Sequence, residues 1–379
     1  MSIDLTGLTA RPSQVWGGVR LVPLVRDEPV PGLRLAPETY DEGLGVVQVG
    51  PRAAYVSYIP HAFVLNFGAG PEAVYGTHLD QPGESRPPGR ARLRFHRRMA
   101  RRVDKDRLRF LPLHLALEGY LALHFGGPAT RWQEWSDRAI RNGLSPRCEE
   151  SYTGAAVQGL DEALRVFEIH PGQCGVLVYA ADALATAFVV PHPDDYRVLH
   201  DTLLLDLFGE LIYHYALLSA PVPAFGARID DAGVRTLADL RARAAAQTAA
   251  WTDFHDGVMS RGLLAGEYTH QHVHEVGEFR LSRFLPSFAR GRENHLGEIV
   301  TDGAGRAAYL KTYRLSEQQV RRGHLLAALA RNDWHVEDTA AELGTDAAQL
   351  GLRLERAGFG SLIRQDVMDG YRARVRRGR

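Results

Sequence analysis

Three histidines alternate within one short segment of the chain, at His270, His272 and His274, and Glu278 follows them. Residues two apart in a β-strand face the same side of a sheet, so a strand over 268–281 would present these side chains together. Neutral imidazole rings and a carboxylate are ligands that zinc and iron accept in proteins. The pattern allows a divalent metal site at these four residues, with a solvated or structural histidine cluster as the alternative.

A metal at this cluster would make the chain an enzyme that activates water. Other catalytic signatures are missing from the sequence. There is no Gly-x-Ser-x-Gly nucleophile elbow, and the glycine-rich segments lack the Lys-Ser/Thr of a phosphate loop. Neither Cys148 nor Cys174 has neighbours that favour a thiolate. Enzyme activity is therefore left open, with a non-enzymatic role favoured and no cofactor expected beyond the metal.

The elements that would position these residues predict an α+β fold. Short β-type segments separated by Gly and Pro fill the first part of the chain, at 19–25, 45–49, 54–59, 62–67 and 73–75. Amphipathic helices are expected at 108–125, 132–142 and 159–167, and two further strands at 175–180 and 184–190. A helix should begin at Pro193 and run to about 218. Asp302 and Gly303 form the turn of a predicted hairpin that spans 299–310.

The segment 230–262 is rich in alanine and arginine, with Leu237, Leu240, Ala244 and Trp251 at nearly helical spacing. It predicts a long helix that has both a polar and an apolar face. Packing on its own domain is the favoured role, and a lever or a dimer contact are the alternatives.

The last part of the chain predicts three short helices that must pack together to bury their apolar residues. The first covers 321–330, the second ends at Gly344, and the third begins after Asp346 and ends at Gly358. Their expected contacts are made by Leu329, Leu343, Leu350, Leu354 and Phe359.

This trihelical pattern resembles the Fis-type helix-turn-helix of bacterial regulators. The positions that carry the resemblance are Thr339, Ala340, Leu343, Gly344, Leu350, Leu354 and Gly358. The resemblance implies binding to duplex DNA. Early in the third helix the family has a basic residue and a Ser or Thr, where this chain has Ala347 and Gln349. Phosphate contacts are therefore favoured over base contacts. The predicted DNA-binding residues are Gln349, Arg353, Arg356, Arg364, Arg372, Arg374, Arg376 and Arg377. A protein-docking bundle with a solvated basic tail is the alternative.

Residues 15–220 carry a second resemblance. It rests on the strand at 19–24, Val64 to Asn66, the turn at Pro171 to Gln173, and the helix start at His192 to Asp194. The segment is similar to the bacterial ADP-ribosylglycohydrolase and rhodanese-phosphatase-associated protein domain. The resemblance implies a link to ADP-ribose or nucleotide conflict systems and supplies no catalytic residues.

Composition limits the remaining possibilities. The chain has 379 residues, is 45% hydrophobic, and carries 45 basic and 45 acidic side chains. It is long enough for three units, predicted at 1–220, 221–314 and 315–379. Zero net charge means that attraction to polyanions must come from local clusters, such as the arginine-rich segment 86–109, which is otherwise a solvated linker.

Two cysteines and the lack of an N-terminal signal or an uninterrupted apolar span favour a cytoplasmic bacterial protein. The function predicted from the sequence is a non-enzymatic regulator, DNA-associated or complex-forming, whose body recognises a ligand or partner. The alternatives are the metal-dependent enzyme and a scaffold subunit of a multi-protein defence assembly.

Overall fold

The computed structural model describes residues 3–33, 46–50, 53–56, 109–110, 165–197, 200, 220–224, 229 and 231–378. Several predicted elements lie outside these residues. They are the strands at 62–67 and 73–75, the helix at 132–142, and most of the helices at 108–125, 159–167 and 193–218. Nearly all of the arginine-rich segment 86–109 lies outside them as well.

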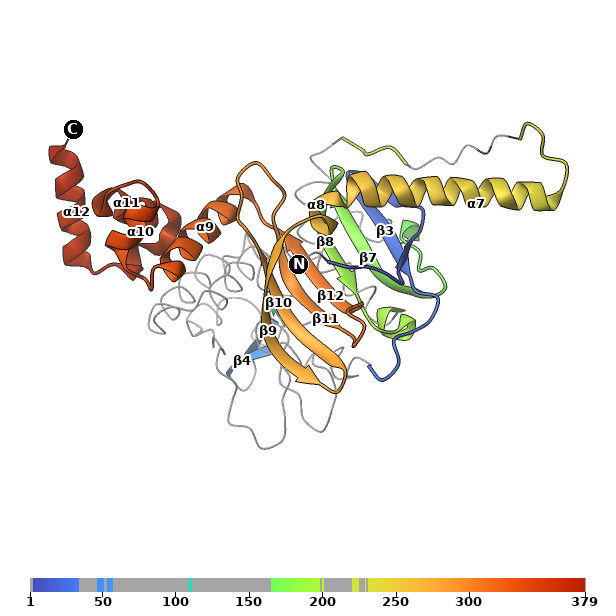
Figure 1. The fold of residues 1–379 in the computed structure, drawn as a ribbon, viewed down its shortest axis with the longest axis horizontal. Coiled ribbons are helices and arrows are strands. Elements are labelled where there is room, and N and C mark those ends of the chain that lie inside the picture. Colours follow the sequence, from blue (N-terminus) through green and yellow to red (C-terminus); the bar gives the residue numbers. More distant parts are fainter. Residues whose placement is uncertain are drawn as a thin grey trace.

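Nine strands of the described chain form one antiparallel sheet (Figure 1). Its order is β1-β3-β7-β8-β12-β11-β10-β9, and β2 pairs with β3. The strands are β1 (Thr9–Ala10), β2 (Gln14–Trp16), β3 (Val19–Val25), β7 (Gln173–Ala180), β8 (Ala183–Val189), β9 (Tyr268–Val276), β10 (Phe279–Pro286), β11 (His295–Thr301) and β12 (Ala307–Arg314). With the helices described below, the sheet confirms the predicted α+β class.

The order of the strands joins distant parts of the sequence. β12 pairs with β8 from Leu310↔Val189 to Tyr313↔Thr186. Strands from both sides of the boundary predicted at residue 220 therefore belong to the same sheet. β3 and β7 are buried along their whole length, which agrees with their mostly apolar sequences. One face of the sheet packs in a core with Trp251 and Leu263 from the helices that follow.

A small second sheet contains β4 (Val46–Gly50), β5 (Ala53–Val56) and β6 (Arg109–Phe110). β4 and β5 agree with the strands predicted at 45–49 and 54–59. β6 pairs in parallel with β5 and lies at the start of the helix predicted at 108–125. That helix prediction was wrong for Arg109 and Phe110, because pairing with a distant strand decides their conformation.

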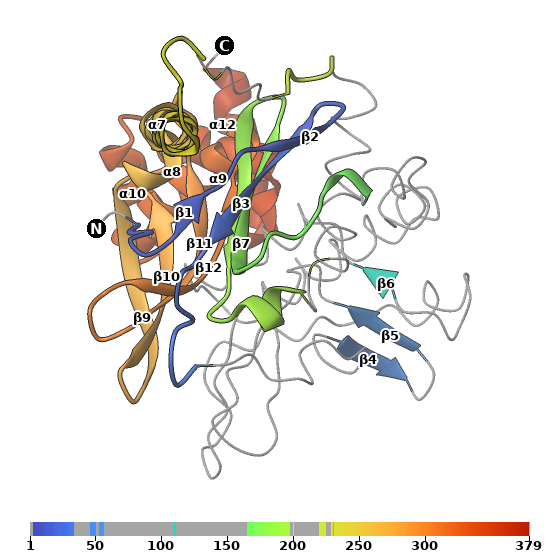
Figure 2. The ribbon, with the colours of Figure 1, turned by 90° about the vertical axis from the view of Figure 1, so that its right-hand side faces the viewer.

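A long helix, α7 (Leu237–Phe254), crosses one edge of the sheet and projects away from it (Figures 1 and 2). It begins with a capping box in which the Thr236 side chain accepts from the Asp239 backbone N–H and Asp239 accepts from that of Thr236. A π-helical turn at His255–Met259 and the short helix α8 (Arg261–Leu264) follow. The helix predicted within 230–262 is thus present and ends where it reaches the core.

The C-terminal residues form a compact helical unit, here meaning α9 to α12. Its elements are α9 (Glu317–Arg331), α10 (Val336–Glu342), α11 (Ala347–Leu354), a π-helical turn (Glu355–Phe359), a 3-10 turn (Gly360–Leu362) and α12 (Gln365–Arg377). The helices share a core that includes Leu329, Leu350 and Leu354, with Leu343 and Phe359 against it, as predicted. Gly344 and Gly358 adopt the left-handed φ values of 62° and 88°.

The helical unit differs from the prediction at its end and at its junction with the sheet. The expected basic tail is helix α12, which adds Met368 and Tyr371 to the core. At the other end, α9 follows β12 almost directly, because Ser316 is its N-cap. The intervening Leu315 is buried, and its backbone N–H donates to Asn294 O at 2.8 Å. The unit is therefore attached to the sheet without a loose linker.

The described residues include no helix that is both long enough and apolar enough to cross a membrane.

Candidate anion-binding site between the helical unit and the sheet

A cavity of about 650 Å³ lies where α9, the end of α11 and the loop between β10 and β11 meet. Most of its described lining residues are arginines, namely Arg290, Arg321, Arg322, Arg353 and Arg356, and His324 adds an imidazole. The other lining residues that the structure describes are Gln318, Leu325, Leu343 and Ala357. We call this cavity the arginine pocket. Its volume lies within the usual range for ligand sites, which is roughly 300–1,000 Å³.

Several arginines of the pocket have no carboxylate partner within the part of the chain that the structure describes. Arg321 forms an ion pair with Glu317, one turn earlier on α9. Among the described residues, no carboxylate is within ion-pair distance of Arg290, Arg353 or Arg356. Converging guanidinium groups of this kind attract anions and can hold phosphate or carboxylate groups through paired N–H donors.

The pKa values of two pocket residues are lowered by their surroundings. The pKa of His324 is lowered by burial and, in addition, by the positive charges of Arg290 and Arg331. The pKa of Arg322 is also lowered by burial. His324 is therefore a neutral imidazole at neutral pH, and an anion that entered the pocket would favour its protonation.

The pocket depends on a close contact between the sheet and α9. Phe288 is buried in the loop after β10, and its ring lies against Gly323 on α9. A Cβ atom at Gly323 would stand 2.1 Å from Phe288 Cε1, so the contact requires glycine. Arg290 comes two residues after Phe288. The docked phenylalanine thereby fixes the part of the loop that carries Arg290 beside α9.

The structure separates the predicted DNA-binding residues into groups. Gln349, Arg353 and Arg356 are exposed along one side of α11 and the π-helical turn after it, spaced by four and three residues. Arg353 and Arg356 line the arginine pocket, whereas the Gln349 side chain accepts from Thr345 Oγ1 at 3.0 Å.

Two other predicted residues have carboxylate partners. Arg364 bonds to both carboxylate oxygens of Asp366, at 3.1 and 2.7 Å. Arg372 forms ion pairs with Glu355 and Asp369, and its hydrogen bond holds the pKa of Glu355 below the usual value. Arg374, Arg376 and Arg377 occupy the last turn of α12, where they also oppose the negative end of the helix dipole.

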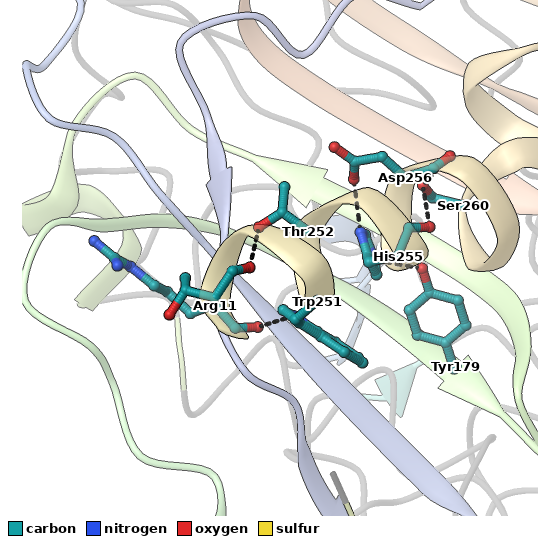
Figure 3. A network of polar contacts seen from close by, with 8 residues as sticks. Arg11, Tyr179, Trp251, Thr252, His255, Asp256 and Ser260 are labelled. Carbon is teal, nitrogen blue, oxygen red and sulfur yellow. Dashed lines mark hydrogen bonds and ion pairs between the residues drawn. The ribbon is translucent and has the colours of Figure 1, made fainter. Parts of the chain in front are cut away.

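A second polar constellation joins the end of α7 to the sheet (Figure 3). Asp256 Oδ1 lies 2.8 Å from His255 Nδ1, and His255 Nε2 lies 2.7 Å from the Tyr179 hydroxyl. A carboxylate can only accept, so Nδ1 donates to Asp256. Nε2 shares the second hydrogen bond with the Tyr179 hydroxyl. Burial, together with the negative charges of Asp256 and Glu293, raises the pKa of Tyr179. Tyr179 and His255 are 0% and 1% exposed, so this arrangement fixes α7 on β7.

A family model described as ARPP-2 matches residues 3–277. The chain belongs to the ARPP-2 family. No curated protein and no solved structure matches the chain significantly.

The ARPP-2 segment contains the strands up to β9, helix α7 and the Tyr179–His255–Asp256 constellation. It ends before β10, so Arg290 and the whole helical unit lie beyond it. The lining residues of the arginine pocket that the structure describes therefore all lie outside the ARPP-2 match.

The predicted metal ligands lie at the end of the ARPP-2 segment. Residues 268–281 were expected to form one strand, but they form a hairpin, because β9 ends at Val276 and Gly277 turns the chain at a φ of 58°. His272 pairs with Ser282 and His274 with Leu281, which places a bulge between them and breaks the expected alternation.

The side chains of this hairpin show where three of the four predicted ligands lie. His270 stacks obliquely on Phe284, and His272 Nε2 lies 3.6 Å from Glu275 Oε1. Glu278 is exposed in the turn, and the side chain of His274 lies outside the described atoms. Within the described residues, no three His, Cys, Asp or Glu side chains are grouped as metal ligands.

A buried cationic residue that the sequence analysis did not single out lies on the other face of the sheet. Lys311 pairs across the strands with Glu298, which Arg283 approaches to 3.7 Å. Burial lowers the pKa of Lys311 to about 8, against the partly compensating charge of Glu298.

We expect this lysine to give the unfolding free energy a distinctive pH dependence. Between pH 8 and 10.5 the unfolded chain holds a proton at Lys311 that the folded chain has lost, so stability rises with pH in this window. Relative to Lys311→Met, the wild type should gain up to about 3 kcal/mol across it. Urea unfolding at several pH values measures the difference, and two parallel curves would contradict the assignment.

Sequence reasoning missed most of the arginine pocket. The start of α9 carries a short basic segment with Arg321, Arg322 and His324, which could have been recognised from the sequence as a candidate anion-binding segment. Arg290 gave no such signal, because it reaches the site through the docking of Phe288 on Gly323.

Proposed function

We propose that the helical unit binds the phosphate backbone of duplex DNA, and that the chain acts as a non-enzymatic, DNA-associated regulator in the cytoplasm. In this proposal the ARPP-2 body recognises a ligand or a protein partner. The observation that carries it is the convergence of five arginines on one pocket, three of which have no carboxylate partner among the described residues.

The shape of the site favours a phosphate backbone over a single small anion. Gln349 extends the line of Arg353 and Arg356 along α11 and does not line the pocket, so exposed polar side chains able to contact phosphates continue beyond one cavity. The exposed arginines at the end of α12 add positive charge to the same unit. Arginine contacts of this type position a duplex and carry no sequence information. The proposed binding is therefore strong at low salt and indifferent to sequence.

The test is the affinity of the full chain for a labelled duplex, measured by fluorescence anisotropy at several salt concentrations. Arg353→Ala with Arg356→Ala should weaken binding about 100-fold, because each lost arginine–phosphate contact contributes about 1.5 kcal/mol. The slope of log affinity against log salt should also fall by about 2, since two phosphates are no longer neutralised.

Arg364→Ala is the matched control, because Asp366 already occupies its guanidinium group. This variant should bind almost as the wild type does, and thermal unfolding should show that all variants are folded. Equal affinities for the wild type and the double variant, or an affinity that does not change with salt, would refute the proposal.

A further inference from the structure

Helix α7 leaves large apolar side chains uncovered near both of its ends. Trp251 is its one buried residue, although the helix spans 18 residues. Seven large hydrophobic side chains are exposed in the described chain, and four of them lie on α7 or on the π-helical turn after it. They are Leu237 (72% exposed), Leu240 (42%), Phe254 (52%) and Val258 (62%). A helix that makes so few contacts has little tertiary packing to stabilise it, so its apolar side chains call for a partner.

The helix is nevertheless capped at its start and anchored at its end. The capping box of Thr236 and Asp239 closes its first turn. At the other end, Trp251 Nε1 donates to Arg11 O at 3.2 Å, and His255 is fixed between Tyr179 and Asp256 (Figure 3). The first half of α7 therefore projects from the sheet as one continuous helical rod, opposite the helical unit (Figure 1).

The distribution of side chains along the rod fits a second copy of the same helix running in the opposite direction. Exposed apolar residues occur near both ends, while the middle is rich in alanine, which allows two helices to approach closely. Leu240, Gln247 and Phe254 repeat every seven residues and share one side of the helix. With Gln247 at the centre, an antiparallel copy places Leu240 beside the partner's Phe254.

The charged side chains of α7 also favour an antiparallel pair. After the capping Asp239, the first half of α7 carries Arg241 and Arg243, whereas Asp253 lies in its last turn and Asp256 just beyond it. An antiparallel pair brings the basic half of each helix beside the acidic end of the other. A parallel pair would place like charges together, which is unfavourable. We propose that two copies of this chain associate through α7 in an antiparallel arrangement.

The proposal is tested by the molar mass of the full chain, measured by light scattering over a range of concentrations. The wild type should be a dimer. Leu240→Glu with Phe254→Glu should give the mass of one chain, because both substitutions place charge within the apolar contact. Ala245→Glu is the matched control, since Ala245 is exposed on the opposite side of α7 and should leave the dimer intact.

A charge exchange tests the direction of the helices. Asp253→Arg should weaken the dimer by at least tenfold, and adding Arg241→Asp and Arg243→Asp should restore it. In an antiparallel pair, Gln247→Cys should form a disulfide across the dimer axis, whereas Leu237→Cys should not. The unmodified chain under the same oxidation is the control for its native cysteines.

A single-chain mass for the wild type at all concentrations would overturn the proposal, as would a dimer that survives the two glutamates. Efficient cross-linking at Leu237→Cys would overturn the antiparallel direction. Circular dichroism should show that every variant retains its fold, which is expected because each substituted side chain is solvent-exposed or partly exposed.

Discussion

Replacing Gly297 with alanine should remove at least about 3 kcal/mol of the unfolding free energy, because the strand has no room for a methyl group. A Cβ atom at this position would stand 1.9 Å from Lys311 O and 2.8 Å from Thr312 Cα, both in the backbone of β12. The ring of Phe284 closes the same space from β10, at 2.8 Å. Backbone atoms cannot rotate away as a side chain would. The methyl group can therefore be accommodated only if β11 and β12 separate.

Urea unfolding followed by fluorescence measures this loss, with Gly257→Ala as the control. Gly257 has no heavy atom within 4 Å of its virtual Cβ, so the same substitution should change the unfolding midpoint little. A Gly297→Ala variant that unfolds at the wild-type midpoint would show that the β11–β12 pairing is looser than described.

Replacing Gly323 with alanine should weaken DNA binding about tenfold without touching a charged residue. The new methyl group displaces the ring of Phe288, which lies 2.1 Å from its position, and the loop that holds Arg290 moves from α9. One arginine–phosphate contact, of about 1.5 kcal/mol, is then lost. The overpacked contact should also lower the unfolding free energy by about 1–3 kcal/mol. Both effects are measured on the same protein, by duplex binding and by urea unfolding.

A second substitution distinguishes displacement of the loop from a general defect. Phe288→Ala combined with Gly323→Ala leaves space for the methyl group, so part of the lost stability should return. Gly370→Ala on α12 is the control, because nothing lies within 4 Å of its virtual Cβ, and alanine there should stabilise the helix by about 1 kcal/mol. Unchanged duplex affinity in Gly323→Ala would mean that Arg290 does not contribute to the site.

Local sequence patterns predicted the elements whose conformation their own residues decide. The strand at 19–25 and the hairpin around Asp302 were predicted correctly, as were the strands at 175–180 and 184–190 within a residue or two at each end. The pairing of these strands was not predictable in the same way. Arg20, for example, reaches Asp182, which is 162 residues away, and no periodicity in either segment records this contact.

The candidate site was predicted in part for a similar reason. Arg353 and Arg356 followed from the pattern of α11, whereas Arg290 depends on a contact between the loop and α9. α12 was taken for a tail because its arginines outweighed the spacing of Met368, Tyr371 and Val375, which is helical. The predicted metal site assumed that side chains alternate between the two faces of one unbroken strand. A β-bulge interrupts this alternation, and the sequence contains no residue type that indicates it.

The short junction between β12 and α9 has a mechanical consequence. With Leu315 buried and bonded to Asn294, the helical unit cannot swing freely, as a domain on a flexible tether would. Force applied to the helices is instead passed into β12, and from there to β8, which belongs to the ARPP-2 segment. The strand that ends at the helical unit is thus the same one that pairs with the ARPP-2 segment, so a displacement of the helices is transmitted to that segment through β12.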